Sequence, residues 1–231
     1  MIRQGVSDKL KRLILIYCAI FFLFSHELTQ AVEKMNKQTI ADVGDLKLKL
    51  VQVGDPVLRQ EARTLTKEEI LSPSIQQLIE LMKITMHDAP GVGLAAPQVG
   101  VPIQLAVIED REEYSKTLTA KEIEQRERRP VAFHVIINPK LTILETAPYV
   151  DFFEGCLSVS GYMANVSRAL AVKVDCLNEK GEPVSIQARG WYARILQHEI
   201  DHLHGTLYID RMTAKTLTTL ENYRKFYVPP K

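Results

Sequence analysis

The segment His198-Glu199-Ile200-Asp201-His202 constrains this chain most, because it predicts a helix that presents two imidazoles on one face. Residues four apart lie one turn above each other on a helix, so His198 and His202 can bind one metal ion. Glu199 lies beside them and can reach a water on that ion, whose pKa the ion lowers from about 16 toward ~7. We therefore expect a hydrolytic metal site on this helix.

The enzyme classes that share the HExxH pattern differ in the residue that provides the third metal ligand. Tyr208 occupies the position where a metzincin has its third histidine, and Glu221 lies at a tolerable distance for a thermolysin-like peptidase. Cys156 follows a predicted strand, within the run EGCLSV, and a thiol beside a divalent cation is readily deprotonated. We favour Cys156 as the third ligand and keep an HExxH metallopeptidase of the zincin type as the alternative.

The segment 90–100 (PGVGLAAPQVG) contains three glycines and two prolines in eleven residues. Such a composition predicts a loop whose backbone approaches another group closely. Gln98, near its end, offers an amide donor to that group. No phosphate-loop lysine follows, which excludes a nucleotide site of that kind.

The hydrophobic pattern predicts an α+β fold, in which strands surround one buried helix. Helices are expected over 73–87 and 190–204, and the charged insertion 111–129 is expected to be a solvated loop or surface helix. The pattern predicts short strands over 46–53, 103–109, 132–138, 141–145, 149–153, 169–176, 182–188 and 208–210.

The N-terminal residues 1–40 form an extension, whereas 41–231 are expected to form a single domain with a C-terminal tail. An apolar run over 13–24 follows four basic residues. Twelve helical residues span about 18 Å, which is short of the bilayer core of about 30 Å. The run therefore fits a signal-like segment, a retained anchor, or a misassigned start upstream of Met35.

Charge and cysteine content exclude two further classes of protein: those that bind nucleic acid through a general basic field and those held together by disulfides. The 29 basic and 28 acidic residues give a net charge of +1, which provides no general field for nucleic acid. Three cysteines are too few and too scattered for a disulfide framework. Cys18 and Cys176 are interpreted as ordinary small apolar residues.

Three segments together, GVGLAAPQ, EGCLSV and QHEIDHLHG, resemble the signatures of the peptide deformylase family. The resemblance covers about 48–210 and makes 41–231 a single catalytic deformylase domain, with antiparallel or mixed sheets around a central metal-binding helix. The charged insertion and the pair Gly190-Trp191 resemble the type I branch that also occurs in eukaryotic organelles. Ser160 and Met163 differ from the residues that are common at these positions in the family. This difference bears on the fine substrate preference and not on the reaction.

The resemblance implies that Cys156, His198 and His202 hold one divalent metal ion. In the family this ion is usually Fe²⁺, and Zn²⁺, Ni²⁺ or Co²⁺ can replace it. The implied reaction removes the formyl group from the N-formylmethionine of nascent peptides at the ribosome. Glu199 would transfer the proton, while the Gln98 amide and the Leu157 N–H would stabilise the oxyanion.

The resemblance also implies roles around the reacting group. Glu154 and Arg168 would pair and brace the cysteine loop, and Gly93 would meet the substrate backbone. The pocket for the methionine side chain is expected to be formed by Val92, Trp191 and Ile195. Because the substrate emerges from ribosomes, a cytoplasmic location is expected, with export or membrane contact only through a retained N-terminal segment.

Overall fold

The computed structural model describes residues 47–116, 118–144 and 146–228. The predicted N-terminal extension, with its apolar run over 13–24, lies outside these residues, and the hypotheses about it stay predictions. Among the described residues, no helix has both the length and the hydropathy that a bilayer crossing needs. The chain from Lys47 onward makes one compact unit.

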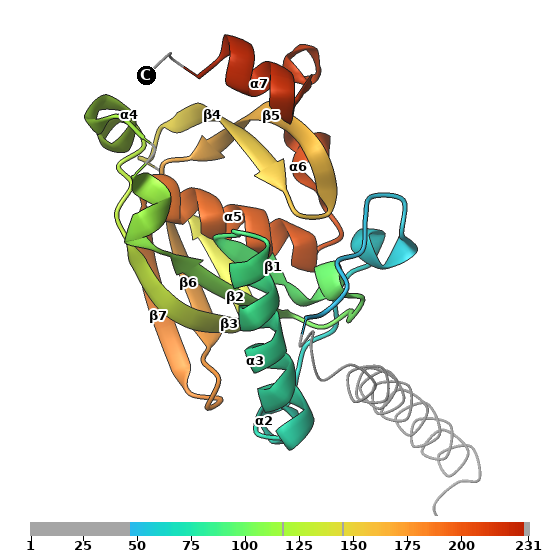
Figure 1. Cartoon of the computed structure of the whole chain (residues 1–231). Helices are drawn as coiled ribbons and strands as arrows, with labels where there is room; N and C mark the ends of the chain where they lie inside the picture. Colours follow the sequence, from blue (N-terminus) through green and yellow to red (C-terminus); the bar gives the residue numbers. More distant parts are fainter. Residues whose placement is uncertain (1–46, 117, 145, 229–231) are drawn as a thin grey trace, which may run out of the picture. The chain divides into compact units, whose positions relative to one another are not determined.

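Two antiparallel sheets lie on either side of helix α5 (Gly190–Leu203), as Figure 1 shows. This arrangement confirms the α+β class and the central position of the helix. The five-stranded sheet has the order β1 (Gly93–Ala95), β2 (Leu105–Asp110), β3 (Val131–Ile143), β6 (Ala171–Leu177) and β7 (Pro183–Arg189). The three-stranded sheet has the order β4 (Tyr149–Cys156), β5 (Val159–Ala169) and β8 (Thr218–Thr219).

The remaining helices lie around these sheets, and capping residues mark the starts of two of them. Thr66 and Glu69 form a capping box at α2, and the Ser72 hydroxyl caps α3, which begins at Pro73. The α-helices are α2 (Lys67–Ile70), α3 (Pro73–Asp88), α4 (Ala120–Gln125), α6 (Tyr208–Arg211) and α7 (Leu220–Phe226). Short 3₁₀ helices occupy Pro56–Arg59, Ala96–Val99, Glu112–Ser115 and Ala214–Thr216.

Helix α5 is buried on nearly every side, which explains why its hydrophobic pattern is so dense. One face packs into the core against the five-stranded sheet. The residues of this face are Ala193, Leu196, Ile200 and Leu203. The polar residues of α5 lie on its other faces. Because the two sheets hold the helix in place, they also fix the directions of these polar side chains.

Strand β5 has no counterpart among the predicted strands. Its sequence mixes small, polar and apolar residues, and the exposed Tyr162 interrupts any alternation. Its burial comes from pairing with β4 on one side and β8 on the other. Only the sheet context therefore makes it a strand.

The two strands predicted over 132–138 and 141–145 are one strand, β3. Asn138 adopts a φ of +50°, and the pairing register with β6 shifts between Ile137 and Lys140. The Asn138 side chain accepts a hydrogen bond from Leu65 N (2.9 Å) and donates one to Leu65 O (2.8 Å). The sequence break at this point is thus a bulge rather than a turn.

Three further predictions are wrong in part. The described residues of 46–53 form no strand, although Val51 N donates to Gln98 O and Val53 N to Ser158 O. The predicted strand 208–210 is helix α6, because the Asp210 carboxylate caps it at Leu207 N (2.7 Å). The predicted loop 90–100 contains β1, which pairs with β2.

Candidate metal centre

Helical spacing arranges the residues of α5 that face the site in two adjacent rows. Arg194, His198 and His202 recur every four residues and face the β4–β5 hairpin. The next row, one position along, consists of Trp191, Ile195 and Glu199 and lines a cavity that is described below. A single helix thus presents a metal-ligand row beside a substrate-facing row.

The structure brings together the three predicted ligands. Ligand atoms of Cys156, His198 and His202 all lie within 4.8 Å of one another, and Cys156 Sγ is 3.2 Å from His202 Nε2. Ligands of a tetrahedral ion at bond lengths of about 2.0–2.3 Å are about 3.5 Å apart. One sulfur and two imidazole nitrogens form a donor set that suits zinc or iron. The residues therefore fit one divalent ion.

Hydrogen bonds from neighbouring groups orient two of the ligands, Cys156 and His198. Cys156 Sγ accepts hydrogen bonds from Ser158 N (3.4 Å) and from Gln98 Nε2 (3.5 Å). His198 Nδ1 is bonded to a Glu154 carboxylate oxygen at 2.9 Å, which leaves Nε2 for a metal. Burial lowers the pKa of His202 well below its usual value, whereas hydrogen bonds with Cys156 and Glu154 raise the pKa of His198.

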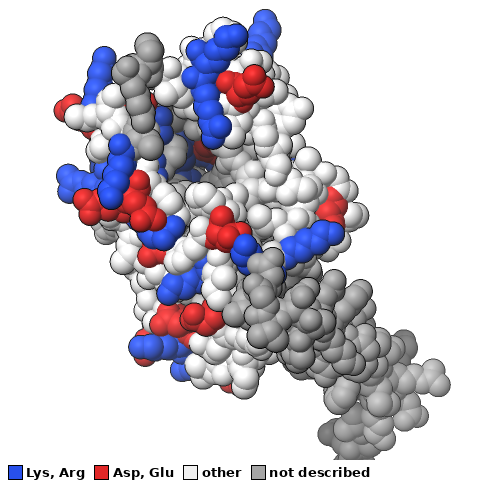
Figure 2. Space-filling view, viewed as in Figure 1, with Lys and Arg blue, Asp and Glu red and all other residues white. Residues whose placement is uncertain are grey.

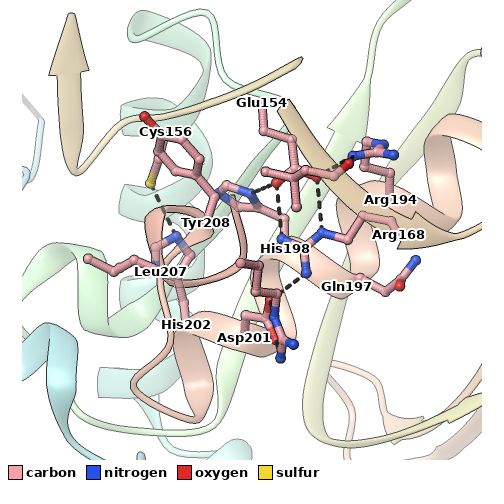
Figure 3. A network of polar contacts seen from close by, with 12 residues as sticks. Glu154, Cys156, Arg168, Arg194, Gln197, His198, Asp201, His202, Leu207 and Tyr208 are labelled. Atoms are coloured by element: carbon pink, nitrogen blue, oxygen red, sulfur yellow. Dashed lines mark hydrogen bonds and ion pairs between the residues drawn. The ribbon is translucent and has the colours of Figure 1, made fainter. Parts of the chain in front are cut away.

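Glu154 is the centre of a buried charge network (Figure 3). Its carboxylate accepts two hydrogen bonds from Arg168 (3.0 Å each) and one from Arg194 (2.7 Å), besides the contact with His198. Burial alone would raise the pKa of Glu154, but the hydrogen bonds from His198 and Arg168 outweigh it and hold the pKa low. Arg168 also pairs with Asp201. The predicted pairing of Glu154 with Arg168 is thus present in the structure.

We expect Glu154→Gln to lower metal affinity by about 10- to 100-fold, because the substitution removes the charge that orients His198. Competition with a chromogenic chelator measures this. Glu61→Gln is the matched control, since Glu61 holds the exposed His204 through an equivalent contact of 2.6 Å. Equal affinities in the two variants, both with native melting behaviour, would contradict a role for Glu154 in orienting the ligand.

Glu199 is buried next to the ligand cluster and keeps one oxygen free. Among the described residues, its Oε2 has no hydrogen-bond partner. Burial raises the pKa of Glu199 to about 7, a value that suits a group that takes and returns a proton near neutral pH. Gly93 packs directly on this side chain, because a Cβ added there would lie 2.3 Å from Glu199 Oε1. A glycine at this position therefore leaves the room that the carboxylate occupies.

Gln98 is buried with its amide held in one orientation. Its Oε1 accepts a hydrogen bond from Ala95 N (2.8 Å), so its Nε2 points toward Cys156 and Ser158. Leu157 lies in the turn between β4 and β5, and its carbonyl accepts a hydrogen bond from the Gln52 side chain (2.9 Å). Both predicted oxyanion donors thus lie beside the thiol.

A cavity of about 440 Å³ opens at this cluster. Figure 2 shows a hollow on the face seen in Figure 1, with acidic and basic side chains interspersed around it. All four residues expected to contact substrate line the cavity: Val92, Gly93, Trp191 and Ile195. Cys156, Leu157, His198 and Glu199 line it too, so the ligand cluster and the predicted pocket share one space.

Several cavity residues were not predicted. Arg194 could have been found, because it continues the four-residue spacing of the histidines by one turn. Arg126 comes from the charged insertion, and its guanidinium stacks 5.0 Å from the Trp191 ring. Leu220 and Tyr223 come from the C-terminal helix, where no local pattern indicates a site.

The charged insertion contains the surface helix α4, as predicted, but its end is buried rather than solvated. Arg128 and Asp110 form a buried ion pair at 2.7 Å, with side-chain exposures of 8% and 2%. Gly190, at a φ of +64°, lets this segment approach, since a Cβ there would lie 2.7 Å from Arg126 O. The insertion is therefore anchored at the start of α5, beside Trp191.

The ligands of the alternative classes do not join the cluster. Glu221 is exposed and lies outside the group of residues that could hold an ion in the described part of the chain. Tyr208 is buried, and its hydroxyl donates to Tyr162 O (3.1 Å) while its ring stacks on His198. The geometry thus favours the cysteine as third ligand over either peptidase pattern.

Comparison with known proteins identifies the family to which this chain is related. A family model described as polypeptide deformylase matches residues 47–217. A chloroplastic peptide deformylase 1A of Solanum lycopersicum is 49% identical over 173 residues, which make up 75% of this chain. The chain spans 62% of the length of that relative.

Solved structures give the same relationship. A peptide deformylase from Synechococcus elongatus, in complex with actinonin, is 37% identical with a TM-score of 0.61, over 74% of this chain and 81% of that one. A class I type b peptide deformylase from Acinetobacter baumannii, bound to Met-Ala-Ser, is 32% identical with a TM-score of 0.62. That match covers 72% of this chain and 98% of the other.

Proposed function

Because this chain belongs to the polypeptide deformylase family, we propose that it hydrolyses the N-terminal formyl group of N-formylmethionyl peptides and releases formate. The observation that carries the proposal is the convergence of Cys156, His198 and His202 at a cavity that the buried Glu199 also lines. The Acinetobacter relative binds Met-Ala-Ser, a peptide of the kind this reaction would release. New polypeptides at the ribosome, in the cytoplasm or an equivalent compartment, are the proposed substrates.

A divalent ion at the three ligands, which we propose is Fe²⁺ natively, with Zn²⁺, Ni²⁺ or Co²⁺ as substitutes, would supply Lewis-acid activation of water and of the formyl carbonyl. Glu199 would accept a proton from the attacking water through its free Oε2. As the carbon–nitrogen bond breaks, the same carboxyl would return this proton to the leaving amine. The products are formate and a peptide with a free amino terminus.

Charge that develops on the formyl oxygen would be met by two donors that are already in place. We assign this role to Gln98 Nε2 and the Leu157 N–H, because the amide of Gln98 is fixed by Ala95 N and both residues line the cavity. Donors fixed in advance cost no reorganisation as the charge forms. The methionine side chain would bind against Val92, Trp191 and Ile195.

The direct test is formate release from formyl-Met-Ala-Ser by anaerobically prepared, iron-loaded protein. We expect release that a strong chelator abolishes and that added metal restores. Absence of formate under these conditions would overturn the proposed function. Cleavage of an internal peptide bond in place of deformylation would favour the peptidase alternative.

Gln98→Ala is expected to lower kcat by about 10²–10³-fold, because one oxyanion donor is lost. Metal content should be kept, since Gln98 contributes only a long contact to Cys156 Sγ (3.5 Å). Steady-state formate release and metal analysis on the same preparation measure both quantities. A variant with native kcat would exclude Gln98 as a donor.

A further inference from the structure

Helix α7, which follows β8 and is the last described helix of the chain, forms a wall of the cavity. Leu220 and Tyr223 of α7 line the same space as the metal-ligand cluster. Both residues lie beyond 217, where the match to the family model ends. The family model therefore does not cover this wall.

The wall is held in place by pairing and packing. Strand β8 pairs with β5 through Thr218 opposite Met163 and Thr219 opposite Tyr162. The Thr219 hydroxyl then caps α7 by accepting a hydrogen bond from Asn222 N (3.2 Å). Figure 1 shows α7 lying over the β4–β5 sheet.

Tyr223 is fixed by an aromatic contact. Its ring centroid lies 4.9 Å from that of Phe153, which also lines the cavity. Tyr227 packs on the same Phe153 ring at 4.8 Å without lining the cavity. The Tyr223 ring is thus positioned before any ligand arrives, and it is only half-buried.

The distance of the wall from the ligands matches the length of a short peptide. Gly155, next to Cys156, lies opposite Met163, which lies opposite Thr218. Two strand spacings of about 4.8 Å place β8 about 10 Å from β4. An extended peptide advances about 3.3 Å per residue, so the second and third residues of a peptide with its formyl group at the ligands reach this wall.

We propose that Leu220 and Tyr223 bind the peptide beyond its formylated residue and favour large apolar side chains there. The inference rests on the proposed function and names the part of the substrate that this site selects. The preference for apolar side chains is expected because Leu220, Tyr223 and Phe153 present aliphatic and aromatic atoms to the cavity. The charged Arg224 and Lys225 of the same helix do not line it.

The test compares kcat/KM for four peptides: formyl-Met-Ala-Ser, formyl-Met-Phe-Ser, formyl-Met-Ala-Phe and formyl-Met-Ala-Asp. The unaltered protein should prefer at least one phenylalanine peptide over formyl-Met-Ala-Ser. Tyr223→Ala and Leu220→Ala should each reduce that preference by about tenfold. Tyr223→Phe keeps the ring and should retain it.

Phe226→Ala is the matched control, because Phe226 is an aromatic of the same helix that is 66% exposed and does not line the cavity. This variant should behave as the unaltered protein does. Melting curves and metal content establish that each variant is folded. If Tyr223→Ala does not fold, the peptide preference of Leu220→Ala alone tests the proposal.

The possible outcomes separate the two proposals. Formate release with an unchanged peptide preference in the folded alanine variants would overturn the assignment of this wall and leave the proposed function standing. Absence of formate from all four peptides with the unaltered, metal-loaded protein would overturn the proposed function itself. A preference for the aspartate peptide would overturn the apolar character assigned to the wall.

Discussion

Glu199→Gln is expected to lower kcat for formyl-Met-Ala-Ser by about 10²–10⁴-fold, which is the usual contribution of a positioned acid–base group. The substitution keeps the size of the side chain and its contact with Gly93 but removes the ability to take a proton. Metal content should stay at one ion per chain, because Glu199 is not among the clustered ligands. Stopped assays of formate with parallel metal analysis measure the effect.

Glu221→Gln is the control for this prediction. Glu221 is exposed on α7 and would be a metal ligand only in a thermolysin-like enzyme. Its substitution should leave kcat unchanged. Native activity of Glu199→Gln would contradict its role as the proton-transferring group, and a large loss with Glu221→Gln would favour the thermolysin-like alternative.

Cys156→Ser should remove most of the bound metal and nearly all activity. Loss of a supporting side chain around a metal costs about 10–100-fold in affinity, and loss of a direct ligand should exceed about 10²-fold. The expected result is a metal content far below one per chain, under conditions in which the unaltered protein is fully loaded. Equilibrium dialysis followed by elemental analysis measures this directly.

Cys176→Ala provides the comparison, because Cys176 is buried in β6 and has no place in the ligand cluster. Burial raises the pKa of its thiol to about 11, so it stays protonated and inert. This variant should keep its metal. Full metal content in Cys156→Ser would instead favour a zincin whose third ligand lies elsewhere.

The metal ligands could be predicted because their geometry is mostly local. The spacing of His198 and His202 fixes their shared face as soon as a helix forms, and α5 begins and ends within a residue of its predicted bounds. Cys156 was harder, since only the fold brings β4 against α5. The motif around it, and not its spacing from the histidines, indicated its role.

The errors concern features that depend on distant partners. Strand β5 is made by its neighbours on both sides, and Asn138 forms a bulge because Leu65 offers it both a donor and an acceptor. The cavity wall at Tyr223 follows from the register of β8 on β5, which no short stretch of sequence encodes. Local patterns therefore predicted the chemistry better than the boundaries of the pocket.

The central claim is that one sulfur and two imidazole nitrogens bind a single catalytic ion. X-ray absorption spectroscopy of the zinc-loaded protein tests it most directly. The expected first shell contains one sulfur at about 2.3 Å and two imidazole nitrogens at about 2.0–2.1 Å, with an oxygen completing the set. A shell of nitrogen and oxygen alone, with Cys156 unbound, would contradict the account.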